Sequence, residues 1–280
     1  MRDLDKWMAE DHARRGESTA MSQERYGTND SEVDIERVRL GMLAAARDPK
    51  TFSVLERIGV SAGMHALELG AGAGTVSAWL ADRVGQEGRV MSTDIDLQFH
   101  GDMPDNVMVR THDIATDALP AEHFDLIHAR AVLQHVPSRE AVIPKLIDAL
   151  KPGGWLVLED GQFLGFGEQG LAEPYRTIHQ IISAGGQEEW RDPNFGLQIL
   201  DRMRANGLVD LDVIGDVWAM RPHEPSGEWW FLALERAIPH LVAAGMVAEE
   251  DGAAALAQVR EPGFVMLSPA SIASIGRKPG

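Results

Sequence analysis

The chain contains no cysteine among its 280 residues. This absence excludes disulfide bonds and thiolate metal ligands, and it agrees with a reducing compartment. Long apolar runs are missing too, because no segment approaches the roughly 20 consecutive apolar residues that a membrane-spanning helix needs. The N-terminal segment is polar and acidic, without the basic and then apolar layout of a secretory signal. We therefore expect a cytoplasmic protein that does not insert into membranes.

Positive charge is also scarce. The chain has 26 lysines and arginines against 43 aspartates and glutamates, a formal net charge of −17. No block rich in lysine or arginine occurs, and Arg14-Arg15 is the nearest approach. Because nucleic-acid binding depends on many Lys and Arg contacts to phosphate, this balance argues against a nucleic-acid partner. A small-molecule ligand is the better prediction.

Glycine is abundant in one short stretch that carries most of the information. Residues 67–75 read LELGAGAGT, after a short, mostly apolar run and before a segment with helical spacing of Val76, Leu80 and Val84. The pattern predicts a buried strand, a tight turn and the start of a helix. Glycines let the backbone turn and let a ligand lie against it, and the helix start offers unpaired N–H groups. We interpret this stretch as a cofactor loop.

Two common cofactor loops are excluded by what this stretch lacks. A dinucleotide fingerprint needs a third glycine where Thr75 stands, which argues against a nicotinamide dehydrogenase. A phosphate-binding P-loop needs a Gly-Lys-Ser/Thr ending, but no lysine occurs between Lys50 and Lys145. A non-catalytic nucleotide-binding module is disfavoured by a set of acids at strand ends, Glu68, Asp94 and Asp113.

With its E-x-G-x-G-x-G spacing, the loop resembles the first motif of the class I S-adenosylmethionine-dependent methyltransferases. Further motifs of these enzymes follow in the expected order, at residues 88–94, 106–114, 124–130 and 150–160. The segments 93–96, 112–114, 128–137 and 154–160 resemble small-molecule methyltransferases of bacterial secondary metabolism, a group that methylates oxygen, nitrogen or carbon. The resemblance implies an α/β fold: a Rossmann-like, seven-stranded, mostly parallel sheet with helices on both faces, N-terminal helices and a helical cap.

The resemblance also implies S-adenosyl-L-methionine as cofactor and suggests its binding residues. Asp94 ends the second strand, where a carboxylate accepts hydrogen bonds from both ribose hydroxyls. Asp113 ends the third strand and corresponds to the acid that accepts from the adenine amino group. Tyr26 is a lid candidate for the methionine end, although an ordinary core or surface tyrosine fits as well. The full set is Tyr26, Glu68, Gly70, Ala71, Gly72, Asp94, Ile95, Asp113, Ile114, Ala129 and Arg130.

Two regions are expected without a clear linker between them. Residues 1–60 form a helical lid or oligomerisation segment, in which one helix begins after Ser31 and stops before Pro49. Residues 61–280 form the methyltransferase domain, with cap insertions around 161–206 and 218–260. The nine residues between Asp96 and Asn106 are too few for the helix that usually joins the second and third strands. This gap leaves sheet surface to be covered and favours a homo-oligomer.

A sulfonium methyl donor is already activated, so the protein mainly has to align the acceptor with the methyl group and exclude water. A general base is needed only where the acceptor proton does not leave on its own. Glu159 and Asp160 are candidates because they end the fifth strand, and ligands of open α/β sheets bind at that edge. His179 is the preferred histidine among His128, His135, His179 and His223, since it shares a helix face with Tyr175. No base stands out, and no metal-ligand set is visible.

The acceptor is expected to be a small organic molecule held against an apolar wall. Aromatic residues of the cap are the candidates, although core packing explains some of them equally well: Trp190, Phe195, Trp229, Trp230 and Phe231. A non-methylating reaction on the same cofactor platform, such as a cyclisation, stays open as an alternative. The sequence does not identify the acceptor or its reacting atom.

Overall fold

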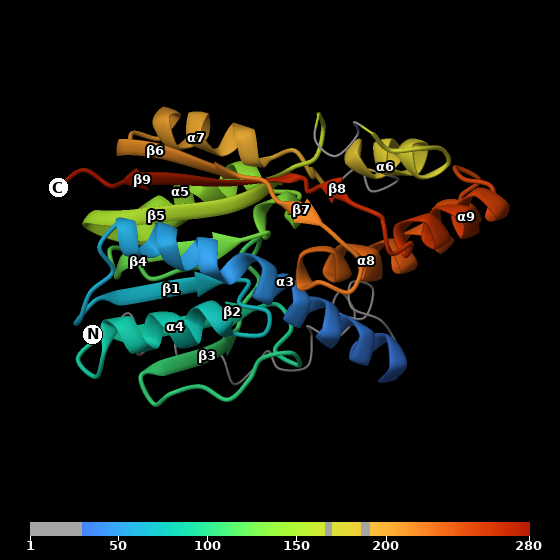
Figure 1. Ribbon diagram of the computed structural model, residues 1–280. Coiled ribbons are helices and arrows are strands. Elements are labelled where there is room, and N and C mark those ends of the chain that lie inside the picture. Colours follow the sequence, from blue (N-terminus) through green and yellow to red (C-terminus); the bar gives the residue numbers. More distant parts are fainter. Residues whose placement is uncertain (1–29, 166–169, 186–190) are drawn as a thin grey trace.

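The computed structural model describes residues 30–165, 170–185 and 191–280. Its centre is a seven-stranded sheet in the order β3-β2-β1-β4-β5-β9-β6 (Figure 1). The first five of these strands run parallel, and β9 is antiparallel to both of its neighbours. The expected seven-stranded, mostly parallel sheet is therefore confirmed. The strands are β1 (His65–Leu69), β2 (Arg89–Asp94), β3 (Val107–Thr111), β4 (Phe124–Arg130), β5 (Leu150–Gln162), β6 (Val209–Asp216) and β9 (Ala270–Arg277).

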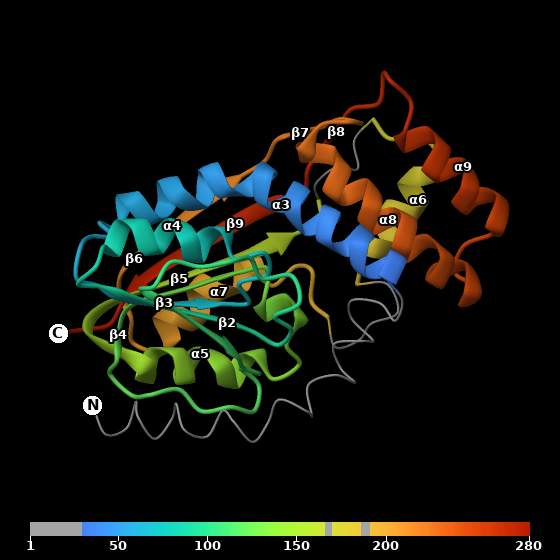
Figure 2. The same ribbon diagram turned by 90° about the horizontal axis from the view of Figure 1, so that it is seen from below.

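Helices cover both faces of the sheet (Figure 2). On one face, α3 (Asp30–Arg57) and α4 (Thr75–Val84) enclose a core that includes Leu55, Leu80 and Val157. On the other face, α5 (Arg139–Ala149) and α7 (Gly196–Ala205) enclose a second core around Leu146 and Ile199. Because the sheet is covered on both faces, most residues of β1 and β4 are buried, and they include the charged Glu68 and His128 besides apolar side chains.

A helical cap lies beyond the carboxyl ends of the parallel strands (Figures 1 and 2). It contains α6 (Tyr175–Ser183), α8 (Pro225–Ala243), α9 (Glu249–Val259) and a small ribbon of β7 (Ala219–Met220) and β8 (Met266–Leu267). A third apolar core, rich in aromatic side chains, fills it. None of the helices in the described ranges is long and apolar enough to span a membrane.

Helix α3 joins the cap to the sheet. It packs along α8 at its N-terminal half and over the sheet at its C-terminal half. The sequence predicted an end before Pro49, and this is wrong, because α3 continues to Arg57. Proline removes one backbone donor from a helix interior. Here the following turns persist because Thr51, Val54 and Leu55 are at most 1% exposed against the sheet.

The connection between β2 and β3 contains no helix, as predicted; residues 95–106 are all described. Its side chains instead fold back onto the glycine loop and β2. His100 Nε2 lies 2.7 Å from Ser92 Oγ, and Ser92 Oγ lies 2.7 Å from Ser77 Oγ of α4. Met108 and Val109 of the edge strand β3 are 36% and 37% exposed. The homo-oligomer stays a prediction.

Candidate active site

The glycine loop follows β1 and leads into α4, as the sequence predicted. Gly70, Gly72 and Gly74 have φ angles of 67°, 54° and 80°, a region that glycine enters without steric cost. A Cβ on Gly70 would lie 2.3 Å from Val132 Cγ2. The backbone N–H of Ala71 donates to the carbonyl oxygen of Thr93 at 2.9 Å, which fixes the loop to the end of β2. Glycine is thus required here both by conformation and by space.

Asp94 lies directly beside this loop. Its carboxylate accepts from the backbone N–H of Gly72 at 2.8 Å and of Asp96 at 3.1 Å. The residue is 6% exposed, and burial raises the pKa of its carboxyl above the ordinary value. Beside Gly72, Leu40 at 4.0 Å is the nearest atom that a Cβ would meet, so this face of the loop has space. A buried carboxylate next to an open glycine face suits the two ribose hydroxyls of S-adenosylmethionine.

The remaining residues predicted to bind the cofactor differ in how deeply they are buried. Asp113 is half-buried after β3, and its Oδ1 accepts from the backbone N–H of Ala115 at 2.9 Å. Ile95 is half-buried after β2, whereas Ile114 and Ala129 pack into the core below the sheet edge. Tyr26 lies outside the described residues. Contacts of these residues with a cofactor stay a prediction.

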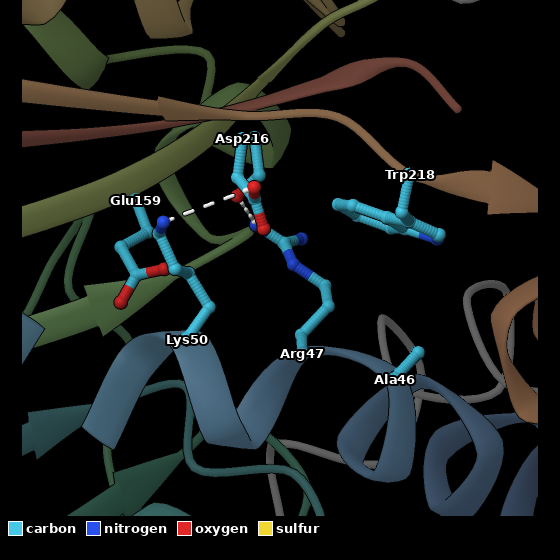
Figure 3. A pocket seen from close by; sticks show the side chains of 7 residues that line it. Ala46, Arg47, Lys50, Glu159, Asp216 and Trp218 are labelled. Carbon is cyan, nitrogen blue, oxygen red and sulfur yellow. Dashed lines mark hydrogen bonds and ion pairs between the residues drawn. The ribbon is translucent and has the colours of Figure 1, made fainter. Parts of the chain in front are cut away.

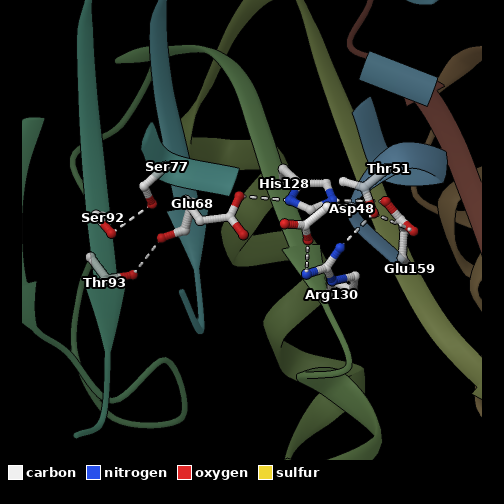
Figure 4. A network of polar contacts seen from close by, with 9 residues as sticks. All are labelled: Asp48, Thr51, Glu68, Ser77, Ser92, Thr93, His128, Arg130 and Glu159. Carbon is white, nitrogen blue, oxygen red and sulfur yellow. Dashed lines mark hydrogen bonds and ion pairs between the residues drawn. The ribbon is translucent and has the colours of Figure 1, made fainter. Parts of the chain in front are cut away.

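A buried ionic network joins β1, β4 and β5 beneath the loop (Figure 4). The imidazole of His128 lies between two carboxylates, with Nδ1 2.6 Å from Glu68 Oε2 and Nε2 3.0 Å from Glu159 Oε1. All three side chains are at most 3% exposed. An imidazolium donates from both ring nitrogens, which suits a ring placed between two carboxylates.

The pKa shifts in this network agree with that assignment. Burial by itself lowers the pKa of His128, but the charges and hydrogen bonds of Glu68 and Glu159 outweigh it and raise the pKa to about 9. For Glu159, burial acts to raise the pKa, and His128, Arg130 and Arg47 together lower it to about 2. Glu159, a predicted catalytic residue, is therefore a permanently ionised partner of His128. Its catalytic role stays a prediction that this geometry does not favour.

Arg130 extends the network to α3. Its guanidinium donates to Asp48 Oδ1 at 2.7 Å and to Thr51 Oγ1 at 2.8 Å, and Thr51 Oγ1 donates to Glu159 at 3.2 Å. The side chain of Arg130 is 11% exposed. Arg130 was expected to bind the cofactor, yet its guanidinium is engaged with α3. No local pattern in the sequence indicates this link, because Asp48 and Thr51 are about 80 residues away along the chain.

Asp160 is the candidate base that has a carboxylate oxygen without a hydrogen-bond partner among the described residues. It is 1% exposed, its carboxyl accepts from the backbone N–H groups of Leu133 and Gln134, and its Oδ1 has no partner among the described residues. Leu133 and Gln134 belong to the short helix η2 (Leu133–His135) after β4. Burial raises the pKa of Asp160 to about 7, against the opposing charge of Arg47. A carboxyl that exchanges its proton near neutral pH is suited to acid–base work.

His179 lies in the cap core rather than at the sheet edge. It is fully buried, with ring contacts to Tyr175 and Trp230, and its Nδ1 lies 3.3 Å from Ser183 Oγ. Tyr175 is engaged as well, since it donates to Met266 Sδ and accepts from Trp230 Nε1 at 2.8 Å. The pairing of Tyr175 with His179 is confirmed, but as part of an aromatic core. The role of His179 as a base stays a prediction.

The predicted aromatic wall is divided between two cores. Phe195 was assigned to the cap, and this is wrong, because it packs in the sheet core with Arg139 and Arg202 over its ring. It precedes α7, whose start packs directly on β5. Trp229, Trp230 and Phe231 do lie in the cap core. Trp190 lies outside the described residues.

Arg47 is a site residue that the sequence did not indicate. It reaches from α3 into a small pocket of about 10 Å³, together with Lys50, Glu159, Asp216, Trp218 and Ser271 (Figure 3). Its Nη2 donates to Ser271 Oγ, whereas its buried Nε has no partner among the described residues. Burial lowers its pKa to about 10. A single arginine on a helix has no pattern that would have distinguished it.

Metal ligands were not predicted, and no group of three or more His, Asp or Glu side chains suited to a metal ion occurs within the described ranges.

The comparisons with known proteins agree with the fold and the loop. A model of a methyltransferase domain family matches residues 43–195. Methyltransferase str3 of Strobilurus tenacellus is 32% identical over 101 residues, 35% of each chain. Trans-aconitate 2-methyltransferase of Paracidovorax citrulli is 32% identical over 162 residues, 56% of this chain and 58% of that one. The chain thus matches about a third to three fifths of the length of such relatives.

The fold also matches the solved structure of a protein from Bacillus halodurans that is described as a methyltransferase. The TM-score is 0.52 at 16% identity, over 81% of this chain and 98% of the other. The sheet order and the glycine loop therefore define a class I, S-adenosylmethionine-dependent type of methyltransferase domain. The chain belongs to the methyltransferase domain family whose model it matches.

Proposed function

We propose that the protein transfers a methyl group from S-adenosyl-L-methionine to a small organic acceptor. The observation that carries this proposal is the buried Asp94 carboxylate beside an open face of the glycine loop, within a chain that belongs to a methyltransferase family. When bound, the donor supplies a methyl group on a sulfonium, which leaves as a neutral thioether. The protein contributes binding, orientation and exclusion of water.

The chain's residues divide this work along the carboxyl edge of the sheet. Asp94 and the loop of Gly70, Ala71 and Gly72 hold the nucleoside. Glu68 is held under that loop by His128, and the network fixes β1, β4 and β5 relative to one another. Asp160 handles the acceptor proton. Ile95, Asp113 and Ile114 are proposed to surround the adenine.

The acceptor is proposed to be a small acid or a hydroxylated compound. One relative is named for trans-aconitate, and the chain matches 58% of that protein's length. The scarcity of Lys and Arg supports a small molecule over a nucleic acid. A role in natural-product biosynthesis, a cytoplasmic location and a homo-oligomer stay predictions.

Isothermal titration of the purified protein with S-adenosylmethionine, S-adenosylhomocysteine and NAD tests the cofactor. We expect micromolar binding of the two sulfur compounds and no heat with NAD. Mass spectrometry of acceptor mixtures then seeks a product heavier by one methyl group. A product of unchanged mass would instead indicate a non-methylating reaction such as a cyclisation. Absence of binding by both sulfur compounds would contradict the proposal.

A further inference from the structure

Three buried polar atoms without partners among the described residues gather around Gly161, near the end of β5. They are Nε of Arg47, Oε1 of Gln134 and Oδ1 of Asp160, and their residues are 8%, 6% and 1% exposed. Most buried polar groups in proteins are hydrogen-bonded, because an unmet donor or acceptor costs free energy. Three such atoms near the end of one strand therefore indicate that a polar ligand or ordered water binds there.

Their proximity follows from the sheet register and from contacts of each residue. Gly161 pairs with Ser271 of β9, and Ser271 Oγ accepts a hydrogen bond from Arg47. On the other side, a Cβ on Gly161 would lie 3.2 Å from Gln134 Oε1. Asp160 precedes Gly161 and accepts from the backbone N–H of Gln134. The three residues come from α3, η2 and β5 and meet where β5 extends beyond the end of β4.

The chemistry of these atoms restricts what could satisfy them. Arg47 Nε–H needs an acceptor, Gln134 Oε1 needs a donor, and Asp160 Oδ1 either accepts or donates according to its protonation. An acceptor molecule with an ionisable O–H group meets these requirements, because its oxygen donates while protonated and accepts once ionised.

Burial and the charges of nearby arginines set the pKa of Asp160 in a range where its carboxyl can exchange a proton. Burial raises the pKa of Asp160 to about 7, and the groups with opposing charge are Arg47 of α3 and Arg139 of α5. Arg47 itself faces Glu159, Asp160 and Asp216 as well as Arg130. A carboxyl in this setting accepts a proton from an acidic hydroxyl at neutral pH, and the nearby guanidinium stabilises the resulting oxyanion.

Resting on the proposed function, we infer that Arg47, Gln134 and Asp160 form the polar end of the acceptor site and select acceptors with an acidic O–H group. In the step, the acceptor O–H bond breaks and its proton passes to Asp160 Oδ1. The electron pair of the oxygen forms the bond to the methyl carbon, and the carbon–sulfur pair stays with sulfur. The proton later leaves Asp160 to solvent. The products are a methyl ether and a neutral thioether.

The first experiment separates the acceptor site from the cofactor site. Wild type, R47M, Q134M and D160N are titrated with S-adenosylhomocysteine by calorimetry. We expect dissociation constants within about 3-fold of wild type, which is under 1 kcal/mol. A loss of about 10-fold or more in these variants, with D94A as the reference for a damaged cofactor site, would assign the three atoms to the cofactor and overturn the inference. Circular dichroism melts confirm that each variant is folded.

The second experiment tests the acceptor class by product mass. The probes are 4-nitrophenol as the oxygen acid and 4-nitroaniline as the matched amine. We expect methylation of an oxygen acid and none of the amine. With the accepted phenol, D160N should lower kcat by about 10²-fold or more, and R47M should raise KM. Ser271→Ala is the matched variant: it removes only the Arg47–Ser271 hydrogen bond and is expected to raise KM less than R47M does.

The outcomes are distinguishable from failure of the proposed function. If the wild-type protein does not bind S-adenosylhomocysteine, the proposed function itself is contradicted. Binding with methylation of the amine alone, or of no oxygen acid, overturns only the inference. So do R47M and D160N enzymes with wild-type kcat and KM, which would mean that ordered water satisfies the three atoms. A pH profile of kcat in which D160N removes an inflection near 7 supports the inference through a readout that packing alone would not move.

Discussion

At the scale of single residues, function depends on side chains whose surroundings are fixed by backbone groups. Asp94 is held by two backbone N–H donors, and Gly70 has no room for a side chain. Both were found from the sequence, because a strand-ending acid and a glycine turn are local patterns. Arg47 and Gln134 were not found from the sequence. Each matters because the fold buries one of its polar atoms without a hydrogen-bond partner among the described residues.

Asp94→Ala is expected to weaken S-adenosylmethionine binding strongly. Each hydrogen bond to a charged group contributes about 1.5–3 kcal/mol, and two ribose hydroxyls are lost together. Calorimetry should show the dissociation constant rising by about 100-fold or more. Asp96→Ala is the matched control, because the Asp96 carboxylate binds Gln98 of its own turn. Equal affinity of D94A and wild type would show that the ribose assignment is wrong.

Gly70→Ala is expected to destabilise the fold and weaken the cofactor site. The new Cβ would meet Val132 Cγ2 at 2.3 Å, and φ is 67°. We expect a loss of about 1–3 kcal/mol in the free energy of unfolding from strain. Urea denaturation of G70A, V132A and the double variant separates the two causes. If the double variant recovers wild-type stability, space alone explains the glycine; a residual loss reports the backbone conformation.

At the scale of elements, α3 is tied to three strands by one buried polar network. Thr51 is central to it, because its hydroxyl accepts from Arg130 and donates to Glu159. The same helix packs along the cap helix α8. One continuous helix, α3, therefore contacts both the cap and the sheet. Pro49 lies inside α3 but does not end it.

Thr51→Val is expected to lower the free energy of unfolding by about 1–3 kcal/mol, because it leaves a buried guanidinium donor and a buried carboxylate with one partner fewer. The substitution keeps the shape of the side chain, so packing changes little. Urea denaturation measures the effect, and Thr51→Ser serves as the control that retains the hydroxyl. A Val variant as stable as the Ser variant would show that water replaces the hydroxyl without loss.

At the scale of the whole molecule, the buried titratable groups make stability depend on pH. The pKa of His128 is raised to about 9 in the folded state from an unfolded value of about 6.5. Its contribution is therefore complete below about 6.5 and is lost as pH rises through about 9. The pKa of Asp160 is raised to about 7, so its burial destabilises the fold increasingly between about 4 and 7. Glu159, with a pKa of about 2, adds stability that is lost as pH falls from about 4.5 to about 2.

We therefore expect the free energy of unfolding to fall as pH rises from about 6.5 to about 9.5, where His128 loses its proton. Urea denaturation at a series of pH values measures this profile. Relative to wild type, D160N should gain stability as pH rises from about 4 to about 7, while the decline toward pH 9 persists. A wild-type profile that is flat from pH 6.5 to 9.5 would show that His128 is not an imidazolium between two carboxylates.

The sequence by itself determined the sheet and the cofactor loop. Short apolar strands, the glycines at 70, 72 and 74, and the acids at strand ends are local features, because backbone conformation and strand burial act over a few residues. The missing helix between β2 and β3 followed from chain length alone. These features sufficed for the class of enzyme and for the place of Asp94 at the end of β2.

Only the tertiary structure decided which distant side chains meet. Glu68, His128 and Glu159 are 60 and 31 residues apart, and they form one network because β4 lies between β1 and β5. Arg47 reaches Ser271 across 224 residues because α3 continues past Pro49 over the sheet. Such contacts depend on strand order and helix packing, which no local pattern encodes, and they determine which carboxyl is fixed as an anion and which is open to exchange a proton.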